Sequence, residues 1–279
     1  MMSAQPGALP AGLAERPSAL AGSAVGRFLS GTHAAARAEL QKLRHDHIDI
    51  FTRSVQPLLW LFIFGTALSA NKQLSGGAAD YRAYITPGVM AQAALFIAIF
   101  FGLAVIWERD VGQLQRLLAT PLPRSAIVVG KAAGAGVRAL VQACLLLIVV
   151  AIAGIGLRFG PLDLIGSLLL LVLGTASFAC LSMLIAAGVR SRERFMGIGQ
   201  LVMMPLFFAS SALYPLSIMP GWLHAVARVN PLTYEVQGLR QMLLGVGGAG
   251  ELWLDFLVVI GFLLVMIAAA TRAYPKAIL

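Results

Sequence analysis

The sequence predicts an all-α membrane protein with six transmembrane helices. Of its 279 residues, 59% are hydrophobic and 12% are charged, and the mean hydropathy is +0.84. A water-soluble domain of this composition would expose large apolar patches. We therefore expect lipid to surround most of the chain, and the positions of apolar segments and of basic residues then give the order and orientation of the helices.

Charged residues and Pro/Gly clusters divide the apolar sequence into six segments near the length of about 20 residues that a bilayer requires. The third helix is expected to begin near residue 125, ahead of its apolar part, as a cytoplasmic extension. The first segment is the shortest and begins beside Arg53. The predicted spans are 55–70, 87–106, 139–155, 164–189, 195–216 and 252–270.

Basic residues collect on one side of these spans. The chain has 21 Lys and Arg against 12 Asp and Glu; sixteen of the 21 lie in the N-terminal region, in the loops after spans two and four, and at the C-terminus. Such a bias predicts that both termini are cytoplasmic in a multi-pass protein of the bacterial inner membrane. A nucleic-acid partner is not expected, because it would need a basic folded face.

The N-terminal region divides into two parts. Residues 1–32 are rich in Ala, Gly, Pro and Ser and lack the apolar core of a signal peptide, so a disordered cytoplasmic tail is expected, followed by a membrane domain over 33–279. Residues 34–53 place Leu40, Leu43, His47 and Ile50 at helical spacing, which predicts a helix in the cytoplasmic headgroup layer. A soluble helix packed on a partner has the same pattern and remains an alternative.

The segment 107–124 is the most informative cytoplasmic loop. It opens with the charges of Glu108, Arg109 and Asp110 and ends at prolines. Between them apolar residues recur at helical spacing: Val111, Leu114, Leu117 and Leu118. A short amphipathic helix between two spans can dock in a groove of a soluble partner and transmit its displacement. A solvated connector that only fixes topology is the alternative.

The stretch 108–132, ERDVGQLQRLLATPLPRSAIVVGKA, resembles the corresponding loop of ABC transporter permeases of the type-two class, close to the daunorubicin-resistance branch. The matching positions are Glu108, Arg109, Gly112, Leu117, Leu118, Pro121 and Lys131. The resemblance implies a coupling helix over 107–120 that docks on an ATP-hydrolysing subunit. Its expected contact residues are Glu108, Arg109, Asp110, Gly112, Leu114, Leu117, Leu118 and Pro121.

A second match to this family follows span five. The family's pattern begins with small and apolar residues and then a proline. After a gap it continues with a proline, an apolar residue, any residue and a tyrosine, and after five more residues it ends with an arginine. Here these elements are Met203, Leu206, Ala209, Ser210 and Ala212, then Met219 and Pro220, and then Pro231, Leu232, Tyr234 and Arg240. With six spans in the expected order, the resemblance covers about residues 40–275.

Two apolar pieces between spans five and six, 221–229 and 232–244, are too short to cross a bilayer of about 30 Å. They predict re-entrant or interfacial outer helices within 218–246, with Asn230 capping the second helix. The resemblance implies that they close the outer end of the substrate path, whereas a role in only capping the fold is the alternative. The expected gate residues are Pro220, Trp222, Pro231, Tyr234 and Arg240.

The chain carries few groups for chemistry of its own. No chain of carboxylates or histidines crosses the predicted spans, no GxxxxGK[ST] phosphate loop occurs, and the histidines and cysteines show no metal-ligand spacing. These features disfavour a secondary transporter and an intramembrane enzyme, and they leave a membrane scaffold as a further alternative. No cofactor is expected on this chain, and ATP and Mg²⁺ are expected on a partner ATPase.

Together these features predict the transmembrane permease subunit of an ATP-driven ABC exporter, not itself an enzyme, that moves a hydrophobic drug, antibiotic or lipid-like substrate. An exporter of polysaccharide or lipid-linked glycan of the same class, or a secondary transporter, is the alternative. Expected partners are a cytoplasmic ABC ATPase, a second permease copy and membrane lipid. By resemblance, spans two and five line the substrate path, although lipid-facing or core packing remains open for each candidate: Phe96, Phe100, Met204, Phe207 and Phe208.

Overall fold

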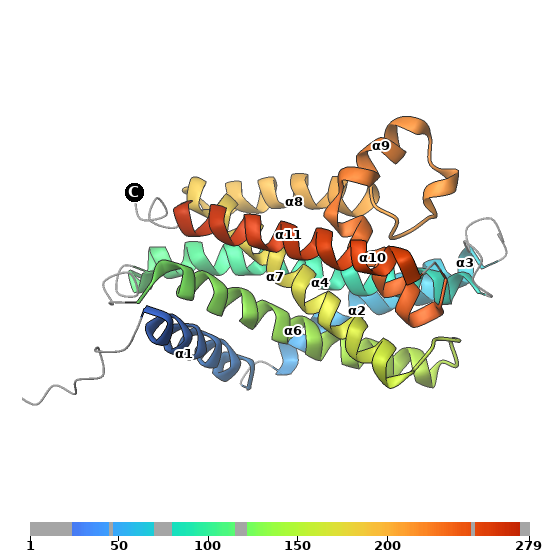
Figure 1. Ribbon diagram of the computed structural model, residues 1–279, viewed down its shortest axis with the longest axis horizontal. Helices are drawn as coiled ribbons and strands as arrows, with labels where there is room; N and C mark the ends of the chain where they lie inside the picture. The colour runs from blue at the N-terminus through green and yellow to red at the C-terminus, as the bar shows by residue number, and fades with distance from the viewer. Residues whose placement is uncertain (1–23, 45–46, 70–79, 115–121, 247–248, 274–279) are drawn as a thin grey trace, which may run out of the picture.

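The computed structural model describes residues 24–44, 47–69, 80–114, 122–246 and 249–273, and within them all regular structure is helical. Its long helices run side by side along one axis (Figure 1). The elements are α1 Ala24–Arg44, α2 His47–Leu59, η1 Trp60–Phe64, α3 Gly65–Ala67, α4 Tyr81–Asp110, α6 Arg124–Ile152, α7 Pro161–Gly188, α8 Arg192–Phe208, η2 Leu216–Ile218, α9 Gly221–Val229, α10 Pro231–Leu244 and α11 Ala249–Ala273.

Four helices among the described residues are long and apolar enough to cross a membrane: α4, α6, α7 and α11. They confirm the predicted spans two, three, four and six. The first predicted span is divided among α2, η1 and α3, where a π-helical stretch interrupts the α-helix. The fifth corresponds to α8, which has 17 residues and ends at Phe208, short of the expected end at 216. Six spans therefore remain a prediction.

Helix α4 forms the centre of the bundle. It is buried over 72% of its apolar stretch, against 11% for α11, so α11 lies on the surface that would face lipid. Gly102 permits a close approach of α4 to α7: its amide donates to Ser182 Oγ at 3.1 Å. A Cβ at this position would lie 2.2 Å from the same oxygen. The missing side chain thus allows a direct contact between the two helices.

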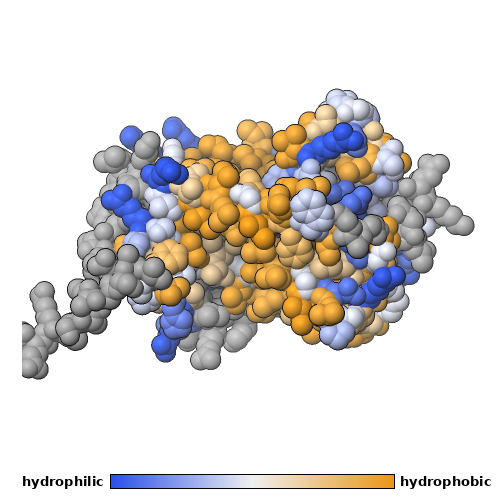
Figure 2. All heavy atoms as spheres, in the orientation of Figure 1, coloured by the Kyte–Doolittle hydropathy of each residue, from blue (hydrophilic) through white to orange (hydrophobic). Residues whose placement is uncertain are grey.

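The surface has the polarity of a membrane protein. Figure 2 shows hydrophobic residues over the middle of the bundle, with hydrophilic residues towards both ends. At one end α4 and α7 finish and α8 begins, and we name it the Asp110 end. The other, at which α4 begins, is named the Asp80 end. A band of this kind lets the helices meet hydrocarbon while the charged ends meet water.

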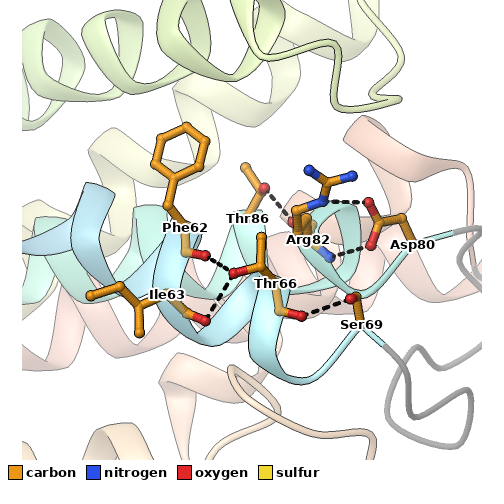
Figure 3. A network of polar contacts seen from close by, with 7 residues as sticks. All are labelled: Phe62, Ile63, Thr66, Ser69, Asp80, Arg82 and Thr86. Carbon is orange, nitrogen blue, oxygen red and sulfur yellow. Dashed lines mark hydrogen bonds and ion pairs between the residues drawn. The ribbon is translucent and has the colours of Figure 1, made fainter.

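Polar contacts secure the Asp80 end where α3 meets α4 (Figure 3). Asp80 caps α4 by accepting from the Arg82 amide at 3.1 Å, and its other oxygen pairs with Arg82 Nε at 2.6 Å. The Thr66 hydroxyl donates to two carbonyls one turn back, and Ser69 Oγ donates to Thr66 O at 2.7 Å. These bonds serve backbone groups that a helix end leaves without partners.

The N-terminal helices differ from the expected layout. Helix α1 begins at Ala24, so residues 24–32, expected in the disordered tail, are helical, and the expected helix 34–53 is shared between α1 and α2. Helix α1 lies along α6 (Figure 1), and a Cβ at Gly31 would lie 3.0 Å from Leu122 Cδ2. The apolar pattern from Leu40 to Phe51 falls on side chains outside the described set, so the interfacial placement stays a prediction.

Candidate functional site

The Asp110 end contains a buried ion pair between α4 and α6. Lys131 Nζ lies 2.6 Å and 2.7 Å from the two carboxylate oxygens of Glu108. Glu108 is 8% exposed and Lys131 is 4% exposed. Both residues belong to the loop motif, and the structure brings them together from different helices. Because both charges are removed from water, the loss of either partner would be costly, and the pair links the last turn of α4 to α6.

A second set of contacts joins the end of α4 to the turn between α7 and α8. Arg109 donates from its two terminal nitrogens to Val189 O at 2.9 Å and to Arg190 O at 2.6 Å. Asp110 pairs with Arg192 at 2.8 Å. The Arg192 guanidinium also lies 3.6 Å from the centre of the Trp107 ring. The charge cluster predicted to contact a partner therefore also holds three helices together.

The predicted coupling helix is divided in the structure. Residues 107–110 form the last turn of α4, and Gly112, with φ at +71°, ends that helix. Helical residues resume at 113, where Leu114 is fully buried, whereas Val111 is 66% exposed. A continuous helix over 107–120 is thus wrong at its start, because a left-handed glycine breaks the helix. Leu117, Leu118 and Pro121 lie outside the described residues.

At the other end of α8, Asn230 organises the turn between α9 and α10. Its side-chain oxygen accepts from the Leu232 amide at 3.0 Å, and Pro231 occupies the first turn of α10. Its amide nitrogen donates to Leu206 O at 2.7 Å and Ala209 O at 3.1 Å. The predicted cap is confirmed, and the same side chain also fastens this turn to the end of α8.

The candidate gate residues do not form one cluster. Arg240 is buried, donates to Ser211 O at 2.8 Å and lies 3.8 Å from the centre of the Tyr84 ring on α4. Burial lowers the pKa of this guanidinium. Tyr234 instead donates to Arg228 O at 2.7 Å on α9. Pro220 precedes α9 and Trp222 is 71% exposed, so these two lie on the surface.

Glu235 on α10 is an acidic residue that the sequence analysis did not single out. It is 1% exposed, and neither carboxylate oxygen has a hydrogen-bond partner among the described residues. A Cβ at Gly174 would lie 2.2 Å from its carboxyl carbon, so the carboxyl group presses against α7. Burial raises the pKa of Glu235 well above its usual value. An acid inside the apolar piece 232–244 is the signal that could have identified it.

A cavity of about 410 Å³ lies among α2, α4 and α6. Its wall includes Phe96 and Phe100, two of the predicted path residues, and the polar side chains of Arg53, Gln56 and Gln142. The Arg53 guanidinium lies 3.9 Å from the centre of the Phe100 ring. The sequence predicts Arg53 just outside the first span, so its contact with Phe100 of α4 was not expected.

A smaller cavity, of about 60 Å³, adjoins α2, α4 and α8. Four predicted path residues line it, namely Phe96, Met204, Phe207 and Phe208. Phe96 borders both cavities. The structure thus brings the candidate path residues to two neighbouring spaces, and their role in transport stays a prediction. No group of three or more metal-ligating side chains occurs among the described residues.

Comparison with known proteins points to transport permeases. The chain is 30% identical over 191 residues to a ycf38 transport permease of Porphyra purpurea, covering 67% of this chain and 64% of that protein. It is 22% identical over 239 residues to the daunorubicin resistance ABC transporter permease protein DrrB1 of Streptomyces coeruleorubidus, covering 84% of this chain and 82% of that protein. Nodulation protein J of Rhizobium leguminosarum bv. trifolii is 29% identical to this chain over 192 residues, covering 68% of this chain and 72% of that protein.

A family model described as ABC-2 type transporter matches residues 31–244, which include both sequence motifs and every described helix except α11 and the first residues of α1. The match covers well over half of the chain, and two of the three relatives above are named as permeases. The protein is a multi-pass, all-helical membrane protein, and it belongs to the ABC-2 type transporter family.

Proposed function

We propose that this chain is the transmembrane permease subunit of an ATP-driven exporter. The observation that carries the proposal is the polar cluster at the Asp110 end. There Glu108, Arg109 and Asp110 bind Lys131 of α6 and the turn 189–192. A segment that a partner pushes at this point is bonded to three helices, so its displacement is passed on to them as rigid bodies.

The partner in this proposal is a cytoplasmic ABC ATPase that binds ATP and Mg²⁺ and docks on the segment 107–120. The exposed Val111 and the buried Leu114 give this segment one face for the partner and one for the bundle. Closure of the ATPase subunits then shifts a permease dimer, of two copies or of two similar chains, between inward-open and outward-open states. The chain itself performs no chemical step.

Six spans are part of the proposal. The continuous helical stretch of α2, η1 and α3 covers residues 47–67, and α8 runs alongside the four long helices (Figure 1). At about 1.5 Å per residue, each is long enough to cross most or all of a hydrocarbon core of about 30 Å. With both included, the charge bias orients both termini to the cytoplasm of a bacterial inner membrane.

The cargo in this proposal is a hydrophobic drug or a lipid-like molecule. A daunorubicin resistance permease is similar to this chain over 84% of its length. The cavities that adjoin α4 are lined by aromatic and Met side chains with a few amides, which suits an apolar molecule with a polar end. Helices α9 and α10, fastened through Asn230 and Arg240, serve as the outer gate.

Co-purification with the ATPase from the same transport system tests this function. We expect a stable complex whose vanadate-sensitive ATP hydrolysis rises when a transported compound is added. Leu117→Asp places a charge on the apolar face of the docking segment and is expected to abolish both complex formation and stimulation. Leu162→Asp, a matched change at the Asp80 end where Leu162 is 86% exposed, is the control. Equal assembly and stimulation in the two variants would overturn the coupling role.

A further inference from the structure

Arg53 packs on a residue of the predicted second span. Its guanidinium is 3.9 Å from the centre of the Phe100 ring. Phe100 precedes Ile106, the last residue of the predicted second span, by almost two helical turns, which is about 9 Å at 1.5 Å per residue. An ionisable side chain at this depth is costly to keep in a membrane, and such residues commonly mark a binding site or a transport path.

The cavity beside Arg53 offers a polar surface from two helices and an aromatic surface from a third. Gln56 of α2 and Gln142 of α6 line it together with Arg53, and Phe96 and Phe100 of α4 form the apolar wall. Gln142 Nε2 also donates to Arg53 O at 3.3 Å, which fixes α2 against α6. The volume of the cavity, about 410 Å³, is enough for a phosphate-sized headgroup and part of the lipid backbone attached to it.

The chemistry of this wall favours an anion. A guanidinium has five N–H donors, so Arg53 can bind a ligand in addition to a protein partner. The two glutamine amides can add further donors. The described residues that line the cavity include no carboxylate. An oxyanion in contact with Arg53 would therefore gain charge-assisted hydrogen bonds and meet no repulsion from the described cavity wall.

The neighbouring cavity supplies a place for an apolar chain. Phe96 forms part of both walls. On its far side lie Trp60 and Phe207, together with Met204 and Phe208, which are 43% and 41% exposed at the surface of the bundle. A molecule with its head beside Arg53 can thus extend past Phe96 towards the lipid-facing side of α8.

We propose that Arg53, Gln56 and Gln142 bind the anionic headgroup of a membrane amphiphile, a phosphate or carboxylate, whose apolar chain runs along Phe96. The ligand enters from the leaflet nearer the Asp110 end. Binding itself is independent of the proposed export function, and only the identification of the ligand as cargo rests on that function. A resident phospholipid and an exported amphiphile present the same chemistry to this cavity.

Native mass spectrometry of the full-length chain tests binding directly. The protein is titrated with dioleoyl phosphatidate and, separately, with zwitterionic dioleoyl phosphatidylcholine. Arg53→Gln is expected to bind phosphatidate about tenfold more weakly, the scale of one lost charge-assisted hydrogen bond. Arg53→Lys, which keeps the charge without the planar fork, should retain part of the affinity. Arg194→Gln removes an equal charge from an exposed position and should bind as the parent does.

Phe96→Trp places a larger side chain between the two cavities and leaves every charge in place. It therefore keeps the test decisive if Arg53→Gln does not fold. It is expected to weaken phosphatidate binding while the thermal midpoint of the chain is retained. Unchanged phosphatidate affinity in a folded Arg53→Gln or Phe96→Trp variant would overturn the proposal. If Arg53→Gln lost affinity for phosphatidate and for phosphatidylcholine by the same factor, the proposal would be overturned too.

Reconstitution with the ATPase separates the two sources of the ligand, and both outcomes require the site. ATP-dependent movement of fluorescent phosphatidate across the bilayer, lost in Arg53→Gln, identifies a cargo. Bound phosphatidate that persists through ATP turnover identifies a resident lipid. A permease that binds phosphatidate but forms no ATPase complex would overturn the proposed function alone, whereas a coupled permease without headgroup binding would overturn this inference alone.

Discussion

The ion pair between Glu108 and Lys131 gives the sharpest test of how the Asp110 end is built. Replacing Lys131 with Met keeps the length of the side chain and removes the positive charge. Glu108 then stays 8% exposed, and its two contacts at 2.6 Å and 2.7 Å are lost. Removing one partner of a buried ion pair typically costs about 3–5 kcal/mol, which is a large part of a typical folding free energy of about 5–15 kcal/mol.

The double variant Glu108→Leu/Lys131→Met removes both charges and replaces them with apolar side chains of similar size. Exchanging a buried pair for packed apolar residues is often neutral or stabilising by about 1–4 kcal/mol. We therefore expect the double variant to be at least as stable as the parent chain. In a thermodynamic cycle the two single changes should show a coupling energy above about 3 kcal/mol, because each removes the opposite charge that lies within hydrogen-bond distance of the other.

Equilibrium unfolding of the four chains in mixed micelles, followed by circular dichroism, gives these free energies. The assay requires the parent chain to refold reversibly so that free energies can be compared. A loss of less than about 1 kcal/mol for Lys131→Met would indicate an exposed pair and would refute the burial argument. Additive losses in the double variant would show that the two residues act independently.

Four further changes test other parts of the structure. Gly88→Ala places a Cβ 2.2 Å from the Ala212 carbonyl oxygen and should cost about 1–3 kcal/mol of unfolding free energy, whereas Gly197→Ala meets nothing within 4 Å and should stabilise α8 by about 0.5–1 kcal/mol. Gly112→Ala, at φ +71°, should cost about 1–2 kcal/mol and lower substrate-stimulated ATP hydrolysis relative to the basal rate. Burial raises the pKa of Glu235, so the folded chain keeps a proton that the unfolded chain releases, and stability falls as pH rises from the usual carboxyl pKa towards the raised one. Glu235→Gln should therefore raise the thermal midpoint at pH 8 and leave it nearly unchanged at pH 4; a lower midpoint at pH 8 would contradict this reasoning.

Local sequence signals were sufficient where one segment determines its own structure. The four confirmed spans are long uninterrupted apolar stretches, and such stretches form helices in lipid because every backbone group is then bonded within the segment. The signal for the cap of α10 was equally local, since Asn230 and Pro231 are adjacent and suit the first turn of a helix. Glycine at 112 is a local signal as well, and it was interpreted as a family match instead of a helix end.

Contacts between distant segments could not be predicted. Arg109 reaches the carbonyl of Val189, 80 positions along the chain, and Lys131 meets Glu108, 23 positions before it, from a different helix. Arg53 was counted as a loop charge because hydropathy treats it as a boundary, whereas its packing on Phe100 places it beside the second span. The buried carboxyl of Glu235 depends likewise on Gly174 of another helix.

Site-directed labelling tests the central claim most directly, namely that force reaches the bundle at the Asp110 end from the cytoplasm. Val111 is 66% exposed at this end and Trp222 is 71% exposed on α9. Each is replaced by Cys in a chain with Cys144→Ala and Cys180→Ala, and a membrane-impermeant maleimide is added to right-side-out and inside-out vesicles. The account predicts labelling of Val111→Cys only in inside-out vesicles and of Trp222→Cys only in right-side-out vesicles. Labelling of Val111→Cys from the outer face would contradict it.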